Sequence, residues 1–273
     1  MWLRLLPEVV RSLARIEERL TRVEEQLREV SGMLLPLVAE DAENRRRLWR
    51  LRESPEYELA FSEEEPLVSV AIATYDRPRL LRERVLPSVL GQTYRNLDVI
   101  VVGDHAAEEV AEAVAAFDDP RLRYRNLTQR IVVGDDPERH WYVASTMARN
   151  EAFRMARGRW LVSFDDDDLM YPDHVRTLLD EARSRRLEVA YGRLRTVLSD
   201  GSTFELGDFP PRREQFGWQG AVYHAGLRFF ERELVAAALQ TPGDWFLLER
   251  MLRAGVRFGM SPTLVCDYFP SRG

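Results

Sequence analysis

Residues 160–168 read Trp-Leu-Val-Ser-Phe-Asp-Asp-Asp-Asp, an apolar run followed by four consecutive carboxylates. The apolar residues 160–164 predict a buried strand, and ligands of open α/β sheets bind where strands end at their carboxyl side. Four adjacent carboxylates repel one another, and Mg²⁺ or Mn²⁺ favours oxygen ligands, often one or two carboxylates plus substrate phosphates. The stretch therefore predicts a metal–phosphate site. The alternative is a solvated acidic turn before a helix, because Asp is favoured at helix N-termini.

Strands and helices alternate along the chain around this stretch. Apolar, β-rich segments predict strands at residues 67–73, 97–102, 122–126 and 160–164. Segments with helical spacing predict helices at residues 79–90, 108–117, 142–156 and 172–184. This alternation indicates an α/β fold with a mostly parallel sheet covered by helices on both faces. Beyond residue 188 the pattern changes to shorter strands, turns and two helices near 231–239 and 243–254.

The N-terminal segment has a different pattern, with apolar residues at alternating spacings of three and four. They are Leu6, Val9, Leu13, Ile16, Leu20, Val23, Leu27, Val30, Leu34 and Leu37. A seam sustained over more than four heptads predicts a coiled coil and therefore a homo-oligomer. The alternative is one long helix that folds back on its own catalytic domain. Trp2 and Leu3, close to Arg4, also allow peripheral contact with a membrane surface.

We therefore expect three parts: a coiled-coil helix over residues 1–53, a linker over 54–66 and an α/β domain over 67–273. The linker is predicted from its two prolines and the run Glu63-Glu64-Glu65.

Composition narrows the classes of function. The net charge of −6 argues against a general nucleic-acid coat. A single cysteine, Cys266, excludes a disulfide within the chain and a zinc–cysteine cluster. The chain contains no lysine, which removes Schiff-base chemistry and the P-loop lysine from consideration. Because no stretch has the length of a membrane span and no secretory signal pattern is present, we expect a cytoplasmic location, at the inner face of the membrane if the N-terminus contacts it.

Four segments, in order, resemble the family 2 glycosyltransferases with the GT-A fold. They are residues 68–78, which include Thr74-Tyr75-Asp76; 88–94 running into Val101-Val102-Gly103-Asp104; Ala148-Arg149-Asn150 with 156–158; and 164–168 with Pro172. A fifth, Gly243-Asp244-Trp245 followed by residues 252–256, looks like the family's late acidic motif. The resemblance covers about residues 66–268 and implies a GT-A, Rossmann-like domain.

The resemblance implies a nucleotide site at the strand ends. Thr74 and Tyr75 end the first strand, where a ring and a hydroxyl can hold a planar base. Asp104 is expected to accept an N–H of the base, and Arg149 to reach the nucleotide or its phosphates, because a guanidinium matches phosphate bidentately. The family's paired acids and following glycine are replaced here by Gly103, Asp104 and His105, which leaves the identity of the base open. The alternatives are a packing role for Tyr75, a helix cap for Asp104 and a surface position for Arg149.

Asp165 and Asp167 form an Asp-x-Asp pattern, which the resemblance identifies with a Mn²⁺ or Mg²⁺ site. Positions i and i+2 of an extended segment point to the same side. Asp166 is a competing ligand or donor contact, because the run of four acids leaves the register ambiguous.

Asp244 is the expected general base, which takes the proton of the acceptor hydroxyl as it attacks the anomeric carbon. Its alternative is an N-cap for the helix that begins near Trp245, and Gly243 replaces an acid that the family often has. His224 and Trp245 are expected at an acceptor pocket, with a structural histidine as the alternative for His224.

The predicted function is metal-dependent transfer of a sugar, with inversion, from a UDP-, GDP- or dTDP-sugar to an acceptor hydroxyl in glycan or glycoconjugate biosynthesis. Two alternatives stay open: a coiled-coil scaffold with a degenerate, non-catalytic transferase domain, and a phosphatase that uses a strand-end aspartate.

Overall fold

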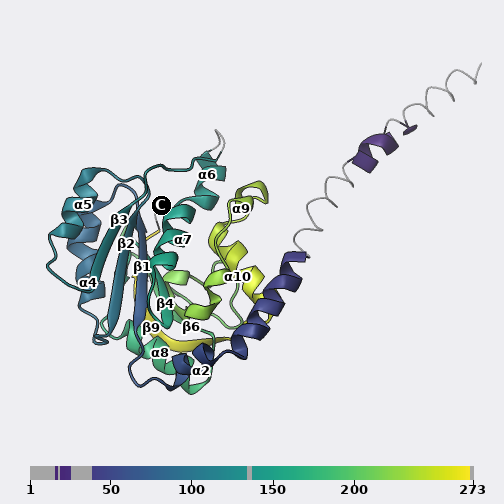
Figure 1. The fold of residues 1–273 in the computed structure, drawn as a ribbon. Helices are drawn as coiled ribbons and strands as arrows, with labels where there is room; N and C mark the ends of the chain where they lie inside the picture. Colours follow the sequence, from purple (N-terminus) through teal and green to yellow (C-terminus); the bar gives the residue numbers. More distant parts are fainter. Residues whose placement is uncertain (1–15, 18, 26–38, 134–136, 271–273) are drawn as a thin grey trace, which may run out of the picture. The chain divides into compact units, whose positions relative to one another are not determined.

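A computed structural model describes residues 16–17, 19–25, 39–133 and 137–270, and the chain divides into two units, Met1–Arg47 and Leu48–Gly273. The described residues of the first unit are helical (Figure 1). Ile16, Leu20 and Val23 of the predicted seam are exposed there. The other seven seam positions lie outside the described residues, so the coiled coil and the homo-oligomer stay predictions.

The first half of the sheet is parallel, as predicted. Its strands lie in the order β3 (Leu122–Asn126), β2 (Leu97–Gly103), β1 (Val68–Thr74) and β4 (Trp160–Asp165). Thr74 is paired with Gly103, and Ala73 with Asp165, so the strands end at one edge of the sheet. Every residue of β1 and β2 is buried, because helices cover both faces.

The two covering layers use alternate residues of these strands. Val68, Val70 and Ile72 pack with the helices that follow β1 and β2, while Ala71 and Ala73 pack with the helix before β4. These helices are α3 (Pro78–Leu80), η2 (Leu81–Val85), α4 (Leu86–Leu90), α5 (Glu108–Ala115) and α7 (Thr146–Met155). Figure 1 shows α4 and α5 on one side of the strands and α7 on the other.

The second half of the sheet is mixed, which departs from a mostly parallel arrangement. Its strands are β5 (Leu169–Met170), β6 (Val189–Val197), β7 (Thr203–Leu206), β8 (Ala221–His224) and β9 (Phe258–Tyr268). β8 pairs antiparallel with β4 and with β6, β7 with β6, and β5 with β9; β6 and β9 are parallel. The short strands predicted beyond residue 188 therefore extend the same sheet through antiparallel neighbours.

The helix predicted over residues 142–156 is divided in two. α6 (Pro137–Val143) ends before Ser145, whose φ of 61° lies in the left-handed region, and α7 begins at Thr146. The remaining helices are α8 (His174–Ser184), α9 (Val235–Ala238) and α10 (Gly243–Ala254), with short 3-10 turns at Trp218–Gly220 (η3) and Ala225–Phe229 (η4). None of the described helices combines the length and apolar character needed to span a membrane.

The segment predicted as a linker, 54–66, is instead mostly a packed helix, α2 (Pro55–Ser62). Ser54 caps it by accepting a hydrogen bond from the Tyr57 N–H, and Pro55 stands at its first turn, where the missing N–H costs nothing. Tyr57 and Phe61, four residues apart, are buried on one face, and the Trp160 indole donates to the Ala60 carbonyl. Of the features that predicted a linker, Pro55 therefore marks a helix start, while Glu63-Glu64-Glu65 and Pro66 form only the short connection from α2 to β1.

Candidate active site

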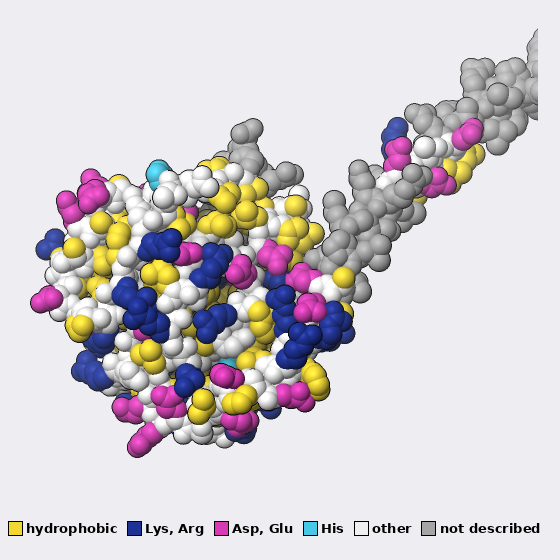
Figure 2. Space-filling view, in the orientation of Figure 1, with side chains coloured by type: hydrophobic (Ala, Val, Ile, Leu, Met, Phe, Trp, Pro, Cys, Tyr) yellow, Lys and Arg dark blue, Asp and Glu magenta, His cyan; other side chains and the backbone are white. Residues whose placement is uncertain are grey.

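A cavity of about 580 Å³ opens where β1, β2 and β4 end. It gathers most of the predicted site residues, which come from segments far apart in the sequence: Thr74, Tyr75, Asp104, Arg149, Asp165, Asp166, Asp167, Asp244 and Trp245. Figure 2 shows basic and acidic side chains intermixed on the hollowed face. The common edge of the parallel strands accounts for the first half of this set, since register alone brings strand ends together.

One end of the cavity is built from the ends of β1 and β2. The Arg130 guanidinium lies 3.7 Å from the centre of the Tyr75 ring, and its Nε lies 3.4 Å from an Asp104 carboxylate oxygen. Burial raises the pKa of Asp104, and the charge of Arg130 opposes that rise. Tyr75 is 41% exposed, so its ring and the guanidinium present a flat surface on which a base could stack. Sequence reasoning missed Arg130, which lies in an irregular segment after β3.

The acidic run is held by arginines. Arg149 is buried and reaches from α7 to Asp165, with 2.6 Å between nitrogen and carboxylate oxygen, while its other terminal nitrogen donates to the Ser163 hydroxyl. One nitrogen of Arg77 lies 2.7 Å from Asp166 and 2.6 Å from Asp167. Arg77 belongs to the family-like segment 68–78 but was not predicted as a site residue.

The four acids do not have the same role. Asp165, Asp166 and Asp167 line the cavity, whereas Asp168 is fully buried and accepts a hydrogen bond from the Phe269 N–H. Burial, and next the charge of Asp165, raise the pKa of Asp167 to about 6. The three lining carboxylates therefore crowd negative charge that the arginines offset in part.

The donor set suits a divalent cation that shares its coordination with a ligand. Among the described residues there is no group of three or more His, Cys, Asp or Glu side chains arranged to hold a metal. Asp165 and Asp167 nevertheless offer carboxylate oxygens to the cavity, and the Asp165 side chain is 37% exposed. Mg²⁺ is commonly bound by one or two carboxylates plus substrate phosphates, so these two residues fit a cation of that kind and not a closed cage.

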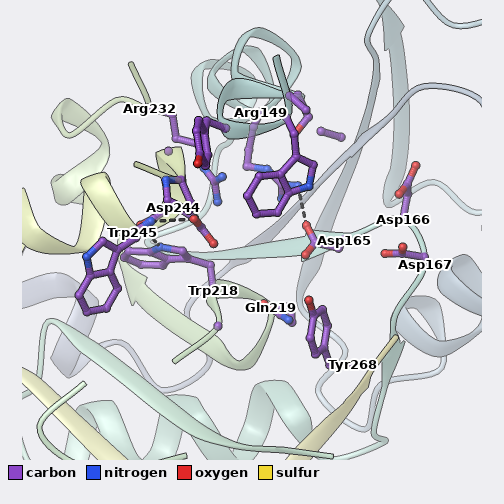
Figure 3. Close-up of a pocket in the computed structure, with 18 of the residues that line it drawn as sticks. Arg149, Asp165, Asp166, Asp167, Trp218, Gln219, Arg232, Asp244, Trp245 and Tyr268 are labelled. Carbon is purple, nitrogen blue, oxygen red and sulfur yellow. Dashed lines mark hydrogen bonds and ion pairs between the residues drawn. The ribbon is translucent and has the colours of Figure 1, made fainter. Parts of the chain in front are cut away.

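The other end of the cavity is built around the start of α10. One carboxylate oxygen of Asp244 accepts the Trp245 N–H at 2.7 Å, and its carbonyl accepts the Trp218 indole N–H at 2.9 Å. The Trp245 indole donates to Glu249 at 2.9 Å. Figure 3 shows Asp244 and Asp165 on two sides of the cavity, with the indoles of Trp218 and Trp245 beside Asp244. Trp218 was not predicted as a site residue.

Arg232 is a further cavity residue that sequence reasoning missed. It follows η4, and Figure 3 shows its side chain together with Arg149 above the space between Asp244 and Asp165. Burial, and next the charge of Arg149, lower its pKa to about 10, while Asp244 and Asp165 favour its charged form. It therefore stays positively charged at neutral pH.

The two glycines that depart from the family pattern, Gly103 and Gly243, are closely packed. A Cβ at Gly103 would lie 2.6 Å from the Asn126 side-chain oxygen and 2.8 Å from the Tyr124 hydroxyl. A Cβ at Gly243 would lie 3.0 Å from the Tyr142 carbonyl. Side chains at these positions would displace neighbouring groups, so the glycines belong to the local packing of this chain.

The structure does not bring His224 to the cavity, which corrects its prediction as an acceptor-pocket residue. His224 is buried beside Tyr57, Phe61 and Trp160, and its ring nitrogen Nδ1 accepts the Gly226 N–H at 2.9 Å. Burial lowers its pKa. His224 is therefore a structural histidine, the alternative given above for this residue.

Part of the chain is similar in sequence to known proteins. Residues 138–238 match the sequence model of Glycosyl transferase family 2. The succinoglycan biosynthesis protein ExoO of Rhizobium meliloti (strain 1021) is 27% identical over 220 residues, which are 72% of this chain and 59% of that protein. The chain thus spans little more than half the length of this relative.

Two solved structures share the fold. S. aureus TarS 1–349 in complex with UDP has a TM-score of 0.59 at 16% identity, over 75% of this chain and 61% of that one. The mannosyltransferase PcManGT from Pyrobaculum calidifontis, in complex with GDP-Man and Mn²⁺, has a TM-score of 0.50 at 18% identity, over 86% and 66%. The predicted α/β fold is confirmed as one like that of the GT-A glycosyltransferases, and it carries a segment that matches glycosyl transferase family 2.

Proposed function

We propose that this chain is a glycosyltransferase that transfers a sugar from a nucleotide-sugar donor to an acceptor hydroxyl in polysaccharide biosynthesis. The observation that carries the proposal is that one cavity joins a stacking surface, a cluster of arginines and carboxylates, and a separate carboxylate, Asp244. These are the three parts that a base, a diphosphate and an attacking hydroxyl need. The UDP and GDP-Man complexes of the structural neighbours, and the biosynthetic role in the name of ExoO, support the same class of reaction.

The donor's nucleotide would lie at the ends of β1 and β2. Tyr75 and Arg130 would stack on the base, and the Asp104 carboxylate would accept one of its N–H groups. Arg149, which already contacts Asp165, would donate to the phosphates, because charge-assisted guanidinium–phosphate bonds are strong and directional.

Asp165 and Asp167 would hold Mn²⁺ or Mg²⁺. When bound, such a cation supplies positive charge that binds the phosphates and stabilises the leaving group. Arg77 would keep Asp166 and Asp167 in place through its ion pairs with both carboxylates.

Asp244 would act as the general base. The Trp245 N–H binds one of its oxygens, which orients the carboxylate and leaves the second oxygen for an acceptor hydroxyl. The hydroxyl oxygen forms a bond to the anomeric carbon as its proton passes to Asp244. The bond from that carbon to the phosphate oxygen breaks, and the electron pair leaves with the nucleoside diphosphate. A single displacement of this kind inverts the anomeric centre.

Trp218 and Trp245 would form the wall on the acceptor side. Trp218 is buried against Phe216 and Tyr223 and supports this wall from behind. The half-buried Trp245, whose indole N–H is bound to Glu249, would offer its ring for apolar contact with sugar rings and for exclusion of water.

The proposal is tested by incubating the purified chain with UDP-, GDP- and dTDP-sugars and measuring release of nucleoside diphosphate with Mn²⁺, with Mg²⁺ and with EDTA. We expect release from one donor class, abolished by EDTA. A chain that binds and cleaves none of these donors under any of the metal conditions would overturn the proposal and favour the scaffold alternative.

A further inference from the structure

The backbone around Arg232 is fixed by two buried polar side chains. The side chain of Asn150 accepts the Arg232 N–H at 3.0 Å and donates to the Arg232 carbonyl at 2.8 Å. Arg250 donates to the Glu231 carbonyl at 2.7 Å and forms an ion pair with Glu233 at 2.7 Å. Both side chains are almost fully buried. Buried polar groups are costly unless they are satisfied, so this short irregular segment is held by strong, specific contacts.

The Arg232 side chain has no such partner. In the part of the chain that the structure describes, its guanidinium makes no hydrogen bond or ion pair, and its buried Nε is without an acceptor. Other arginines of the cavity differ: Arg77, Arg130 and Arg149 each lie within 4 Å of a carboxylate, and Arg213 is exposed. A partly buried guanidinium without an acceptor is an unfavourable arrangement that a ligand would relieve.

The position of Arg232 defines the chemistry of that ligand. This arginine lines the same cavity as Arg149, Asp165 and Asp244, and Figure 3 shows its side chain together with that of Arg149 above the space between the two carboxylates. Two guanidinium groups that face the same space attract an anion. In the proposed reaction, the anion between the phosphate end at Asp165 and the transfer end at Asp244 is the phosphate bonded to the sugar.

We infer that Arg232 and Arg149 together bind the sugar-bearing phosphate of the donor, an assignment that rests on the proposed function. As the bond between the anomeric carbon and the phosphate oxygen breaks, the electron pair stays on that oxygen. Arg232 donates to the phosphate oxygens and stabilises the negative charge that develops there. Asn150 and Arg250 are positioning residues, since they hold the Arg232 backbone and do not reach the ligand.

The test compares nucleotides that differ by this one phosphate. Binding of UDP and UMP, GDP and GMP, and dTDP and dTMP is measured by calorimetry in metal-free buffer, for the wild type and for Arg232→Met. We expect Arg232→Met to weaken binding of the nucleoside diphosphate by about 10- to 100-fold, which is the effect of losing hydrogen bonds to a charged group. The affinity for the matching monophosphate should not change. Arg185→Met, an equal change of charge in an exposed ion pair outside the cavity, should alter neither affinity.

Arg232→Lys guards against a folding defect in the methionine variant. It keeps the charge but loses the forked geometry, so we expect a smaller loss that is again confined to the diphosphate. An equal loss for both nucleotides, or no loss for either, overturns the inference while the proposed function stands. If the wild type binds none of the six nucleotides, either in this buffer or with Mn²⁺ or Mg²⁺ added, the proposed function fails and the inference fails with it.

Discussion

The parallel and mixed halves of the sheet build the two ends of the cavity in different ways. In the parallel half, Thr74, Asp104 and Asp165 stand at or directly after the ends of neighbouring strands, and the hydrogen-bond ladders set their relative positions. In the mixed half, Arg232 and Asp244 come from a loop and a helix start, and individual side-chain contacts set their positions. Sheet topology therefore positions the end of the cavity proposed for the nucleotide, the nucleotide end, which contains Thr74 and Asp104. Local side-chain contacts position the end that contains Asp244, the transfer end.

Replacement of the proposed general base, Asp244, should give the largest effect, because it should lower turnover without changing nucleotide affinity. Asp244→Asn keeps the size of the side chain and its hydrogen bond from Trp245 but removes the proton acceptor. We expect turnover to fall by about 10²- to 10⁴-fold, the usual contribution of general base catalysis, with nucleotide affinity unchanged. Initial rates of nucleoside diphosphate release and calorimetric affinities measure the two quantities.

Glu249→Gln is the matched control on the same helix, since it alters a carboxylate that contacts the Trp245 indole and Arg253. It should change turnover far less. Undiminished turnover in Asp244→Asn would place the base elsewhere and remove the distinction between a nucleotide end and a transfer end.

The parallel half could be predicted because its signals are local and repeated. Apolar runs such as Leu97–Val102 predict buried strands, and each run is followed by the polar residue that lies in the cavity. Parallel pairing then brings the strand ends together without any knowledge of side-chain contacts. Thr74, Asp104 and Asp165 were predicted from these strand-end positions together with the family resemblance.

The rest could not be predicted, because it depends on contacts between segments distant in sequence. Arg130 and Arg232 are two arginines in a chain in which every basic side chain is arginine, and only their packing distinguishes them. His224 has the residue type of a ligand, but the aromatic side chains of α2 and Trp160 enclose it. The misassigned linker and the misassigned histidine thus have one cause, the docking of α2.

The docking of α2 spans the boundary between the halves, since Phe61 packs against Trp160 of β4 and His224 of β8. Phe61→Ala should lower the free energy of unfolding by about 3 to 5 kcal/mol, the range for a buried Phe replaced by Ala. Denaturant unfolding measures this. Leu59→Ala, in the same helix but 43% exposed, should cost much less. A loss in Phe61→Ala no greater than in Leu59→Ala would mean that α2 is the loose connector first predicted.

His174 tests the same boundary through pH, because its ring packs edge-on against Phe164 of β4 in the parallel half. It is buried at the start of α8, where its ring nitrogen Nδ1 donates to the Val265 carbonyl of β9, and burial lowers its pKa from 6.5 to about 4. The unfolded chain therefore binds more protons below pH 6.5, and the stability that the neutral ring contributes is lost as pH falls from 6.5 towards 4.

For this group alone, the loss between pH 7.5 and 5 is about 2 kcal/mol. His174→Gln, which keeps a donor for Val265 and does not titrate, should lose about 2 kcal/mol less than the wild type over the same interval. The measurement is the free energy of urea unfolding at both pH values. Parallel losses in the two proteins would show that protonation of His174 is not what destabilises the fold in acid.

The smallest expected effect concerns the nucleotide end, where Tyr75 and Arg130 form the stacking surface. Tyr75→Ala should weaken binding of the nucleoside monophosphate and of the diphosphate equally, by about fivefold or more. Loss of base stacking costs at least ~1 kcal/mol of binding free energy, and the second phosphate takes no part in stacking. Phe204→Ala, which removes an exposed ring outside the cavity, is the control. The equal loss expected here and the diphosphate-specific loss expected for Arg232→Met would together assign the base and the sugar-bearing phosphate to different parts of the cavity. If Tyr75→Ala affects only the diphosphate, the base lies elsewhere, and strand-end topology does not determine where the nucleotide binds.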